Sequence, residues 1–553
     1  RASLDALRQA LTDPQPGSVL YALGVLDATD RATLSEVLPG LLDHPSPSVR
    51  LDVLARLERQ GDSRYLPTIQ QILQNDGDPQ VQAAALQTVA ALGGLTESAL
   101  LDHYLGGSPP PLRQAAMIGL LRSGSLEGIL AVGETLTKLT VSESVADRIF
   151  AAQVLGESRM AGLYRPLLKL LHDTNPKVQQ TALGAAAKVQ HPHLWPVLIT
   201  ALVAPQTRAS AHSALVAGGE AVLPVVQQAL VQGGPVTVQQ RQGWIALVHV
   251  CGRIASPHSG AFLAAQLTGT SGSVIDGVAR SRLLAALQQC GYRADVTTRP
   301  RLEAELQVEI AQAIWTLTHL VMLGTASQES LLRLSHALRS ELVQQQSRLL
   351  GWLALLYDPT ILQRVRRALA LAPGLRRTPT DEQRAYAMET LDLLLPKALS
   401  KPILLLLDDL PPAQQLKQLA GEASRLALTL PHQLAAIIAG DERWVAPWLK
   451  AIALHTVAEM PPLVQADPLL REAVGQAATN NDPLIQETAA WVMRRSNGAI
   501  PDPSGTLLTI EKVLILQQVE LFAALSMATL VELAACLTER FAATGEVIFV
   551  KDA

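Results

Sequence analysis

The chain has 553 residues, of which 48% are hydrophobic and only 3% aromatic, so its core must be built mainly from Leu, Ala and Val. A formal net charge of −4 provides no global field that would attract nucleic acid. The three cysteines, Cys251, Cys290 and Cys536, lie far apart and lack the spacing of a metal or redox motif, which fits a reducing compartment and argues against a disulfide scaffold.

One short phrase recurs along the chain: a small polar residue, a proline, a branched apolar residue two places on, and then a polar or basic residue. The clear copies are Ser46-Pro47-Ser48-Val49-Arg50, Asp78-Pro79-Gln80-Val81-Gln82, Asn175-Pro176-Lys177-Val178-Gln179 and Asp482-Pro483-Leu484-Ile485-Gln486. The spacing from Val49 to Val81 is 32 residues, and from Val81 to Leu112 it is 31. A fixed period in this range indicates an array of repeats.

The phrase has a physical cause at the start of a helix. Asp, Asn or Ser accepts a hydrogen bond from the free N–H groups of the first turn, and a proline at the first position loses only an N–H that had no partner. We therefore expect Asp78-Pro79 to begin a helix that ends at Gly93-Gly94, before a second apolar stretch over residues 98–105. Each unit is then two short helices that bury their apolar face jointly with their neighbours.

This turn, followed by an Ala-rich helix, resembles the HEAT repeat in its bacterial variety, over residues 1 to about 270 and again near 467–495. The resemblance implies an all-α fold, an α-solenoid of paired helices with no sheet from residue 1 to about 500. Residues 1–300 form the HEAT-like domain in this interpretation. The chain starts at Arg1 and not at Met, so we interpret it as a piece of a longer polypeptide.

The middle of the chain has a different pattern. From about residue 302 the helical patterns lengthen and the prolines vanish, so residues 301–500 are interpreted as a longer-helix continuation of the solenoid. Residues 329–357 predict either one long helix or two with a break near Gly351. Polar residues interrupt the apolar stretch 310–323, and no signal peptide is visible, so we expect no transmembrane segment and a cytoplasmic location.

Two further phrases, Leu353-Ala354-Leu355-Leu356-Tyr357-Asp358 and Arg384-Ala385-Tyr386-Ala387-Met388-Glu389-Thr390-Leu391-Asp392, resemble the soluble region of bacterial proteins related to the ATP:ADP antiporters. In that family a membrane transporter is followed by HEAT repeats and a cyclic-nucleotide-binding domain. The membrane part is absent from this sequence, so transport is not assigned to the chain. The resemblance implies a position at the inner face of the membrane if a transporter precedes the chain.

The C-terminal segment carries the sharpest local signal. After a linker at 501–507, residues 508–553 contain Leu521-Phe522-Ala523-Ala524-Leu525-Ser526 and, after a helical pattern, Phe541-Ala542-Ala543-Thr544-Gly545-Glu546-Val547-Ile548-Phe549. This order is similar to the opening of the cyclic-nucleotide-binding domain. It predicts a helix over 526–539, a strand over 547–550 and a hinge at 501–505, which together make a short, incomplete α/β element.

No nucleotide-binding residue can be carried over from that family. There the phosphate is held further along the chain by the N–H groups of a short helix and an Arg, and this sequence stops at Ala553 before any such segment. The pair Gly545-Glu546 belongs instead to the first turn of the β-roll. We therefore expect no cofactor in this chain, and cyclic AMP or GMP binding only in a chain extended through the missing segment.

One basic cluster is the candidate site for an anionic partner such as lipid headgroups or nucleotide phosphates; the alternative is a solvated surface. It comprises Arg364, Arg366, Arg367, Arg376 and Arg377. The pair His191 and His193 is too small a ligand set for zinc and is interpreted as a repeat turn. Asp408-Asp409 is interpreted as a solvated helix end, with a divalent-cation site as the alternative. No metal site is predicted.

No catalytic motif is present in the sequence, so we predict that the chain is not an enzyme. The first functional interpretation is a scaffold or regulatory solenoid that links an upstream module, such as a nucleotide transporter, to a C-terminal nucleotide sensor. The second is a stand-alone platform that holds a protein partner on its solenoid face. The third and weakest is a HEAT-like lyase acting on bound chromophores. Nucleic acid is expected in none of them.

Overall fold

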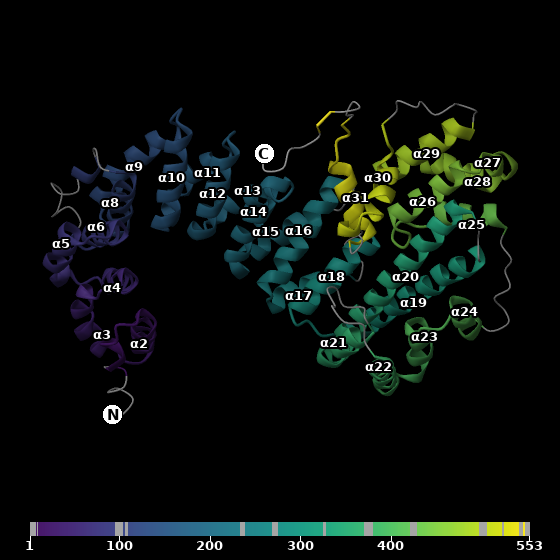
Figure 1. Cartoon of the computed structure of the whole chain (residues 1–553), viewed down its shortest axis with the longest axis horizontal. Coiled ribbons are helices and arrows are strands. Elements are labelled where there is room, and N and C mark those ends of the chain that lie inside the picture. Colours follow the sequence, from purple (N-terminus) through teal and green to yellow (C-terminus); the bar gives the residue numbers. More distant parts are fainter. Residues whose placement is uncertain are drawn as a thin grey trace. The chain divides into compact units, whose positions relative to one another are not determined.

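A computed structural model describes residues 7, 9–93, 103–105, 109–232, 238–267, 275–324, 328–369, 380–420, 429–496, 506–522, 525–540 and 546–547 (Figure 1). These ranges contain helices, turns and loops but no strand, which confirms the all-helical prediction for this part of the chain. The chain divides into two compact units, Arg1–Val222 (unit 1) and Leu223–Ala553 (unit 2). The domain boundary expected near residue 300 stays a prediction; a long helix begins there, at Arg299.

Unit 1 is a stack of short helices in two layers. In one layer α4, α6, α8, α10, α12 and α14 each pack against the next, while α5, α9, α11 and α13 lie in the other. The elements are α2 (Pro16–Thr29), α3 (Arg31–Val37), η1 (Pro39–Asp43), α4 (Pro47–Gln60), η2 (Ser63–Tyr65), α5 (Leu66–Asn75), α6 (Pro79–Gly93), α8 (Pro110–Arg122), α9 (Leu126–Thr140), α10 (Val145–Ser158), η4 (Ala161–Leu163), α11 (Tyr164–Leu171), α12 (Pro176–Val189), η5 (Pro192–Leu194), α13 (Trp195–Ala201), α14 (Pro205–Ala217) and η6 (Gly219–Val222).

The recurring phrase begins helices as expected. The side chain of Asp78 accepts a hydrogen bond from the N–H of Gln80 at 2.8 Å, and that of Asn175 accepts one from the N–H of Lys177 at 2.9 Å. In both cases the following proline is the first helical residue. Ser46 is an exception, because its side chain makes no capping bond and Pro47 alone marks the start of α4.

The basic residue of the phrase has a second role that the sequence did not reveal. Arg50 donates to the carbonyl of His44 at 2.7 Å and forms an ion pair with Asp76, in the next repeat's turn, at 2.8 Å. Arg148 repeats this arrangement, binding Asp173 at 2.6 Å. At these two places an Arg joins the turn of one repeat to the turn of the next, and we call these two sets of bonds the turn ladder. At the same position of the phrase, Gln82 and Gln179 instead donate to the carbonyls of Asp76 and Leu171, which precede their own helices.

Close approach between neighbouring helices depends on glycine at two places in this layer. A Cβ at Gly119 of α8 would lie 2.4 Å from the carbonyl oxygen of Gln87 in α6, and a Cβ at Gly156 of α10 would lie 2.8 Å from Ala185 in α12. Neither contact is possible without a shift of the backbone. The small residues of this chain thus set the spacing of the helices as well as filling the core.

Unit 2 contains longer helices and longer-range packing. Its elements are α15 (Leu223–Gln232), α16 (Val238–Ile254), α17 (Pro257–Leu267), α18 (Gly277–Gln289), α19 (Arg299–Leu323), α20 (Glu329–Leu356), α21 (Pro359–Ala368), α22 (Asp381–Leu394), α23 (Lys397–Leu407), α24 (Pro412–Ala420), α25 (Leu430–Ala439), α26 (Pro447–Ala458), α27 (Pro461–Ala466), α28 (Pro468–Ala477), α29 (Pro483–Ser496), α30 (Thr509–Gln517), η8 (Glu520–Phe522) and α31 (Met527–Cys536). Of the two alternatives for residues 329–357, the structure has one unbroken helix. It continues through Gly351, which packs closely on Leu284 of α18.

The antiparallel pair α19 and α20 forms the centre of unit 2 (Figure 1). The Nε2 of Gln433 in α25 donates to the carbonyl of His319 at 2.7 Å, 114 residues away along the chain. The hydroxyl of Thr456 in α26 donates to the carbonyl of Ser330 at 3.3 Å, across 126 residues. Unit 2 therefore departs from a simple stack of neighbours, because segments far apart in the sequence meet on this helix pair.

A buried ionic cluster joins α18, α19 and α20. Arg348 binds Glu309 at 2.8 Å and Glu341 at 3.1 Å, and Arg280 lies 3.7 Å from Glu309, with none of these side chains more than 7% exposed. The guanidinium of Arg280 also stacks on the ring of Trp444 at 3.9 Å. Two acids and two bases balance one another here, which is the condition for keeping charges in a low-dielectric core.

The pKa values of the cluster follow from burial and from these partners. Burial raises the pKa of the Glu341 carboxyl, although Arg348 opposes the change. Burial lowers the pKa of Arg280. For Arg348 the effect of burial is outweighed by the charges and hydrogen bonds of Glu309 and Glu341, which raise its pKa.

Among the described residues, α19 is the one unbroken helix that is long and apolar enough to cross a membrane. Half of its apolar window is buried inside the structure, and its Glu309 is ion-paired with Arg348 of the adjacent helix. In this fold α19 serves as a core helix of unit 2.

The C-terminal helices pack on the rest of unit 2. As predicted, the hydroxyl of Ser526 caps α31 by accepting from the N–H of Thr529, but the helix ends at Cys536 and not at 539, because Leu537 adopts an extended conformation. Val513 and Leu530 are buried, whereas Leu521 is 80% exposed. The expected hinge at 501–505 lies outside the described residues, as do residues 548–550 of the expected strand, and the described residues 546–547 are in no strand.

Candidate functional site

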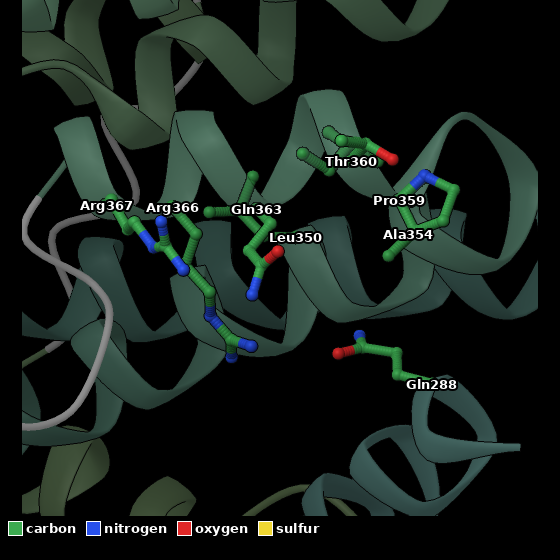
Figure 2. A pocket seen from close by; sticks show the side chains of 9 residues that line it. Gln288, Leu350, Ala354, Pro359, Thr360, Gln363, Arg366 and Arg367 are labelled. Carbon is green, nitrogen blue, oxygen red and sulfur yellow. The ribbon is translucent and has the colours of Figure 1, made fainter. Parts of the chain in front are cut away.

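A cavity of about 530 Å³ lies between α18, α20 and α21 of unit 2 (Figure 2). Its lining combines an apolar part, two amides, a hydroxyl and two guanidinium groups, supplied by Gln288, Leu350, Ala354, Pro359, Thr360, Leu362, Gln363, Arg366 and Arg367. We refer to it as the α21 cavity. It contains two of the five arginines that the sequence singled out.

The local sequence explains how α21 presents these side chains. The carboxylate of Asp358 accepts from the N–H of Thr360 at 2.8 Å, and Pro359 is the first helical residue, so the helix begins in the same way as the repeats. The hydrogen bonds from Thr360 lower the pKa of Asp358. Leu362 and Val365 are buried, and the two polar residues between them are exposed: Gln363 lines the cavity, and Arg364 does not.

Arg366 is the most constrained arginine of the site. Its Nη2 donates to the carbonyl and the hydroxyl of Ser347, while its Nε is buried and has no hydrogen-bond partner in the described part of the chain. Burial lowers the pKa of this guanidinium from its usual value, although it stays protonated at any physiological pH. Among the described residues, the partners that hold this charge at the cavity wall are neutral.

The other predicted arginines differ from Arg366. Arg367 is exposed and lines the cavity, whereas Arg364 is exposed on the same helix and does not line it. Arg376 and Arg377 lie outside the described residues. The structure therefore brings Arg366 and Arg367 together at one site, and an anionic partner for the cluster stays a prediction.

The amide side chains were missed by the sequence analysis. Gln288 reaches the cavity from the last turn of α18, where its Nε2 donates to the carbonyl of Gly351 at 3.3 Å. Figure 2 shows Gln363 and Leu350 between the arginines at one end and Pro359 at the other, with Gln288 approaching from the opposite side. No local sequence signal predicts this meeting, because it depends on how α18 and α20 pack.

The histidine pair forms part of a repeat turn, as expected. His191 and His193 flank the start of η5, and the ring of His191 stacks on Tyr164 with centroids 4.1 Å apart. Burial and the neighbouring His193 lower the pKa of His191. Within the ranges that the structure describes, no group of three or more His, Cys, Asp or Glu side chains is placed to hold a metal ion.

The acidic pair Asp408-Asp409 follows the last residue of α23, which confirms that it marks a helix end. Asp408 accepts a hydrogen bond from the N–H of Asp409, whose carboxylate lies 3.5 Å from Arg384. The cysteines are free thiols: burial raises the pKa of Cys251 to about 12 and that of Cys290 to about 11, so both are protonated at neutral pH.

Comparison with known proteins relates one part of the chain to a family. A family model described as HEAT repeats matches residues 34–121, which include α4, α5, α6 and α8. This agrees with the resemblance drawn from the recurring phrase in that region. No curated protein sequence matches the chain.

Several solved structures match the chain at low similarity. Yeast importin-β (Kap95p) is 12% identical, with 90% of this chain and 74% of that chain covered and a TM-score of 0.30. The karyopherin Kap121p bound to the extreme C-terminus of the phosphatase Cdc14p is 11% identical, with 96% and 60% covered and a TM-score of 0.25. At these scores nothing about the partners of this chain follows from the likeness.

Proposed function

We propose that the chain is a binding scaffold that holds a partner polypeptide on its stacked helices, and we assign no catalysis to it. The observation that carries this proposal is the construction of unit 1. Helix pairs, several of them with capped starts, are joined at two places by the turn ladder, and residues 34–121 match HEAT repeats. Such an array spreads its stability over many repeats and presents a long, continuous surface for binding.

Site-specific photo-crosslinking tests this proposal. A photoreactive residue is placed at exposed positions of one layer, Gln153 in α10 and Gln180 in α12, and of the other layer, Glu134 in α9 and Lys169 in α11. A partner that binds the array gives the same crosslinked protein from both positions of one layer and little from the other layer. Absence of any reproducible protein crosslink at all four positions would refute the scaffold.

A second, finer proposal concerns what the scaffold connects. We infer that it links an upstream module, such as a nucleotide transporter, to a C-terminal cyclic-nucleotide sensor. It is supported by the two sequence resemblances and by the position of Ser526, which caps α31 where the sensor's opening helix is expected. The location that follows is the cytoplasm, at the inner face of the membrane when a transporter precedes the chain.

Calorimetry with cyclic AMP and cyclic GMP tests the sensor. We expect no heat of binding with residues 1–553 and clear binding with a chain extended through a phosphate-binding segment that contains its Arg. Binding to the shorter chain would mean that the site is misplaced. Absence of binding to the longer chain would leave the C-terminal element as a structural cap.

A further inference from the structure

The α21 cavity has a positive charge that no acidic residue of its described lining compensates. Arg366 and Arg367 contribute two positive charges, and among the described residues no Asp or Glu lines the cavity. In the described ranges Arg366 bonds only to Ser347 and to no carboxylate. A cavity with this balance attracts an anionic occupant, because a charge held at a partly buried wall is weakly screened by solvent.

The remaining lining adds two kinds of recognition. Leu350, Ala354 and Pro359 provide an apolar surface beside the arginines. Gln363 is exposed and lines the cavity. The Nε2 of Gln288 donates to the carbonyl of Gly351, and its Oε1 can accept a hydrogen bond from an occupant. An amide side chain presents a donor and an acceptor side by side, which matches the C=O and N–H of a peptide group.

The length of the cavity limits the size of the occupant. Pro359 and Arg366 are seven residues apart on one helix, a distance of about 10 Å at the rise of an α-helix. An extended peptide advances about 3.3 Å per residue, so about three of its residues fit between the apolar end and the arginines. The occupant is therefore short or is the contact point of a longer segment.

The N-terminus of α21 is not available as a phosphate site. Phosphate groups are commonly bound by free N–H groups at a helix N-terminus. Here that end of α21 lacks an N–H at Pro359, and the N–H of Thr360 is already bonded to the carboxylate of Asp358, which also repels a second anion. The free donors are guanidinium groups in the last turn, and a guanidinium fork matches the oxygens of a carboxylate and of a phosphate alike. The choice of a peptide carboxylate therefore rests on the amide and apolar side chains beside the arginines.

We propose that the α21 cavity binds an acidic segment of the partner polypeptide, about three residues long, with Glu or Asp carboxylates at Arg366 and Arg367 and an apolar side chain on Leu350 and Ala354. This rests on the proposed function, since it supplies a contact point for the same partner. It adds the chemistry of the recognised segment, which the repeat architecture alone does not specify.

Fluorescence anisotropy with defined peptides tests the proposal on the whole chain. The probes are fluorescein-labelled, C-terminally amidated Gly-Leu-Leu-Glu-Glu-Gly and Gly-Glu-Glu-Leu-Leu-Gly, since the direction of the bound peptide is open. We expect saturable binding of at least one probe, weakened about tenfold or more when both Glu are changed to Gln, which is the loss expected for charge-assisted hydrogen bonds. If neither probe shows saturable binding at concentrations up to about 1 mM, the proposal is overturned.

Matched variants on α21 locate the binding. Arg367→Gln and Gln363→Glu change exposed cavity residues, so folding is retained, and each should weaken binding about tenfold. Arg364→Gln changes an exposed arginine of the same helix that does not line the cavity, and it should leave binding unchanged. An equal loss in all three variants would indicate general charge attraction and refute the site.

Competition distinguishes the acidic segment from other anions. Inorganic phosphate and ATP should displace the bound probe only at concentrations at which chloride does so by screening. Tighter binding of ATP, or of a probe with phosphoserine in place of one Glu, would overturn the assignment to carboxylates. If the crosslinks in unit 1 form while neither probe binds, this inference fails alone; if no crosslinks form, the scaffold itself fails.

Discussion

Substitution of Glu309 by Gln tests whether the buried ionic cluster stabilises the core of unit 2. Glu309 is fully buried and lies 2.8 Å from Arg348. At an effective dielectric constant of about 20, the direct attraction over 2.8 Å is about 6 kcal/mol. Part of this is offset by the desolvation of both groups, and removal of one partner from a buried pair typically costs about 3–5 kcal/mol. We expect a loss of that size in the free energy of unfolding of unit 2.

Urea denaturation followed by Trp fluorescence is a suitable assay. Six of the seven tryptophans, all except Trp195, lie in unit 2, so a Trp195→Phe background makes the signal specific to that unit. With a denaturant slope of about 3 kcal/mol per M, the midpoint should fall by about 1 M or more. Far-UV circular dichroism of the same samples separates a loss of stability from a loss of the native fold.

A control on the same helix makes the prediction sharp. Glu303 pairs with Arg299 on the exposed side of α19, with both side chains 42% exposed, so Glu303→Gln should change stability by less than about 1 kcal/mol. The double variant Glu309→Leu/Arg348→Met should not recover the lost stability, because it deprives the buried Glu341 and Arg280 of their partners in the cluster. Equal effects of Glu309→Gln and Glu303→Gln would refute the reasoning.

Two other predictions concern helix spacing and pH. Gly156→Ala should destabilise unit 1 and lower its melting temperature, because the new Cβ would lie 2.8 Å from Ala185. Gly184→Ala places its Cβ in open space and should stabilise the unit by about 0.5–1 kcal/mol. Similar melting temperatures for the two variants would contradict this reasoning. Burial lowers the folded-state pKa of His319 and His455 below the unfolded value of about 6.5, so stability should be complete above that pH and decrease as the pH falls from 6.5 toward the lowered values. A urea midpoint that stays constant between pH 7.5 and 5.5 would exclude this, and His455→Gln should reduce the slope.

Local features of the fold could be predicted well from the sequence. Four predicted helix starts depend on a capping side chain, and three of them also on the proline that follows it. The capping residues are Asp78, Asn175, Asp358 and Ser526, and the structure has a helix after each of them. The extent of α20 could not be decided, because Gly351 weakens a helix locally and is accommodated only by its packing on Leu284.

The candidate site could be predicted only in part. The arginines of α21 form a visible cluster, but the selection of Arg366 and Arg367 over Arg364 depends on which residues face α18 and α20. Gln288 has no local signal at all. In the sequence Glu309 looks like a solvent-exposed residue, because the partners that explain its burial, Arg348 and Arg280, lie 39 and 29 residues away along the chain.

The turn ladder has a consequence for how the array can change in length over evolution. Arg50 binds Asp76 of the next turn and Arg148 binds Asp173, so each of these two bonds joins one pair of neighbouring repeats. A whole repeat inserted between α6 and α10 leaves both bonds intact, so unit 1 can grow there in steps of about one repeat, whereas an insertion between α4 and α6 separates Arg50 from Asp76. Unit 2 lacks this freedom around α19 and α20, since the bonds of His319 and Ser330 reach 114 and 126 residues along the chain and a duplicated repeat would displace their partners.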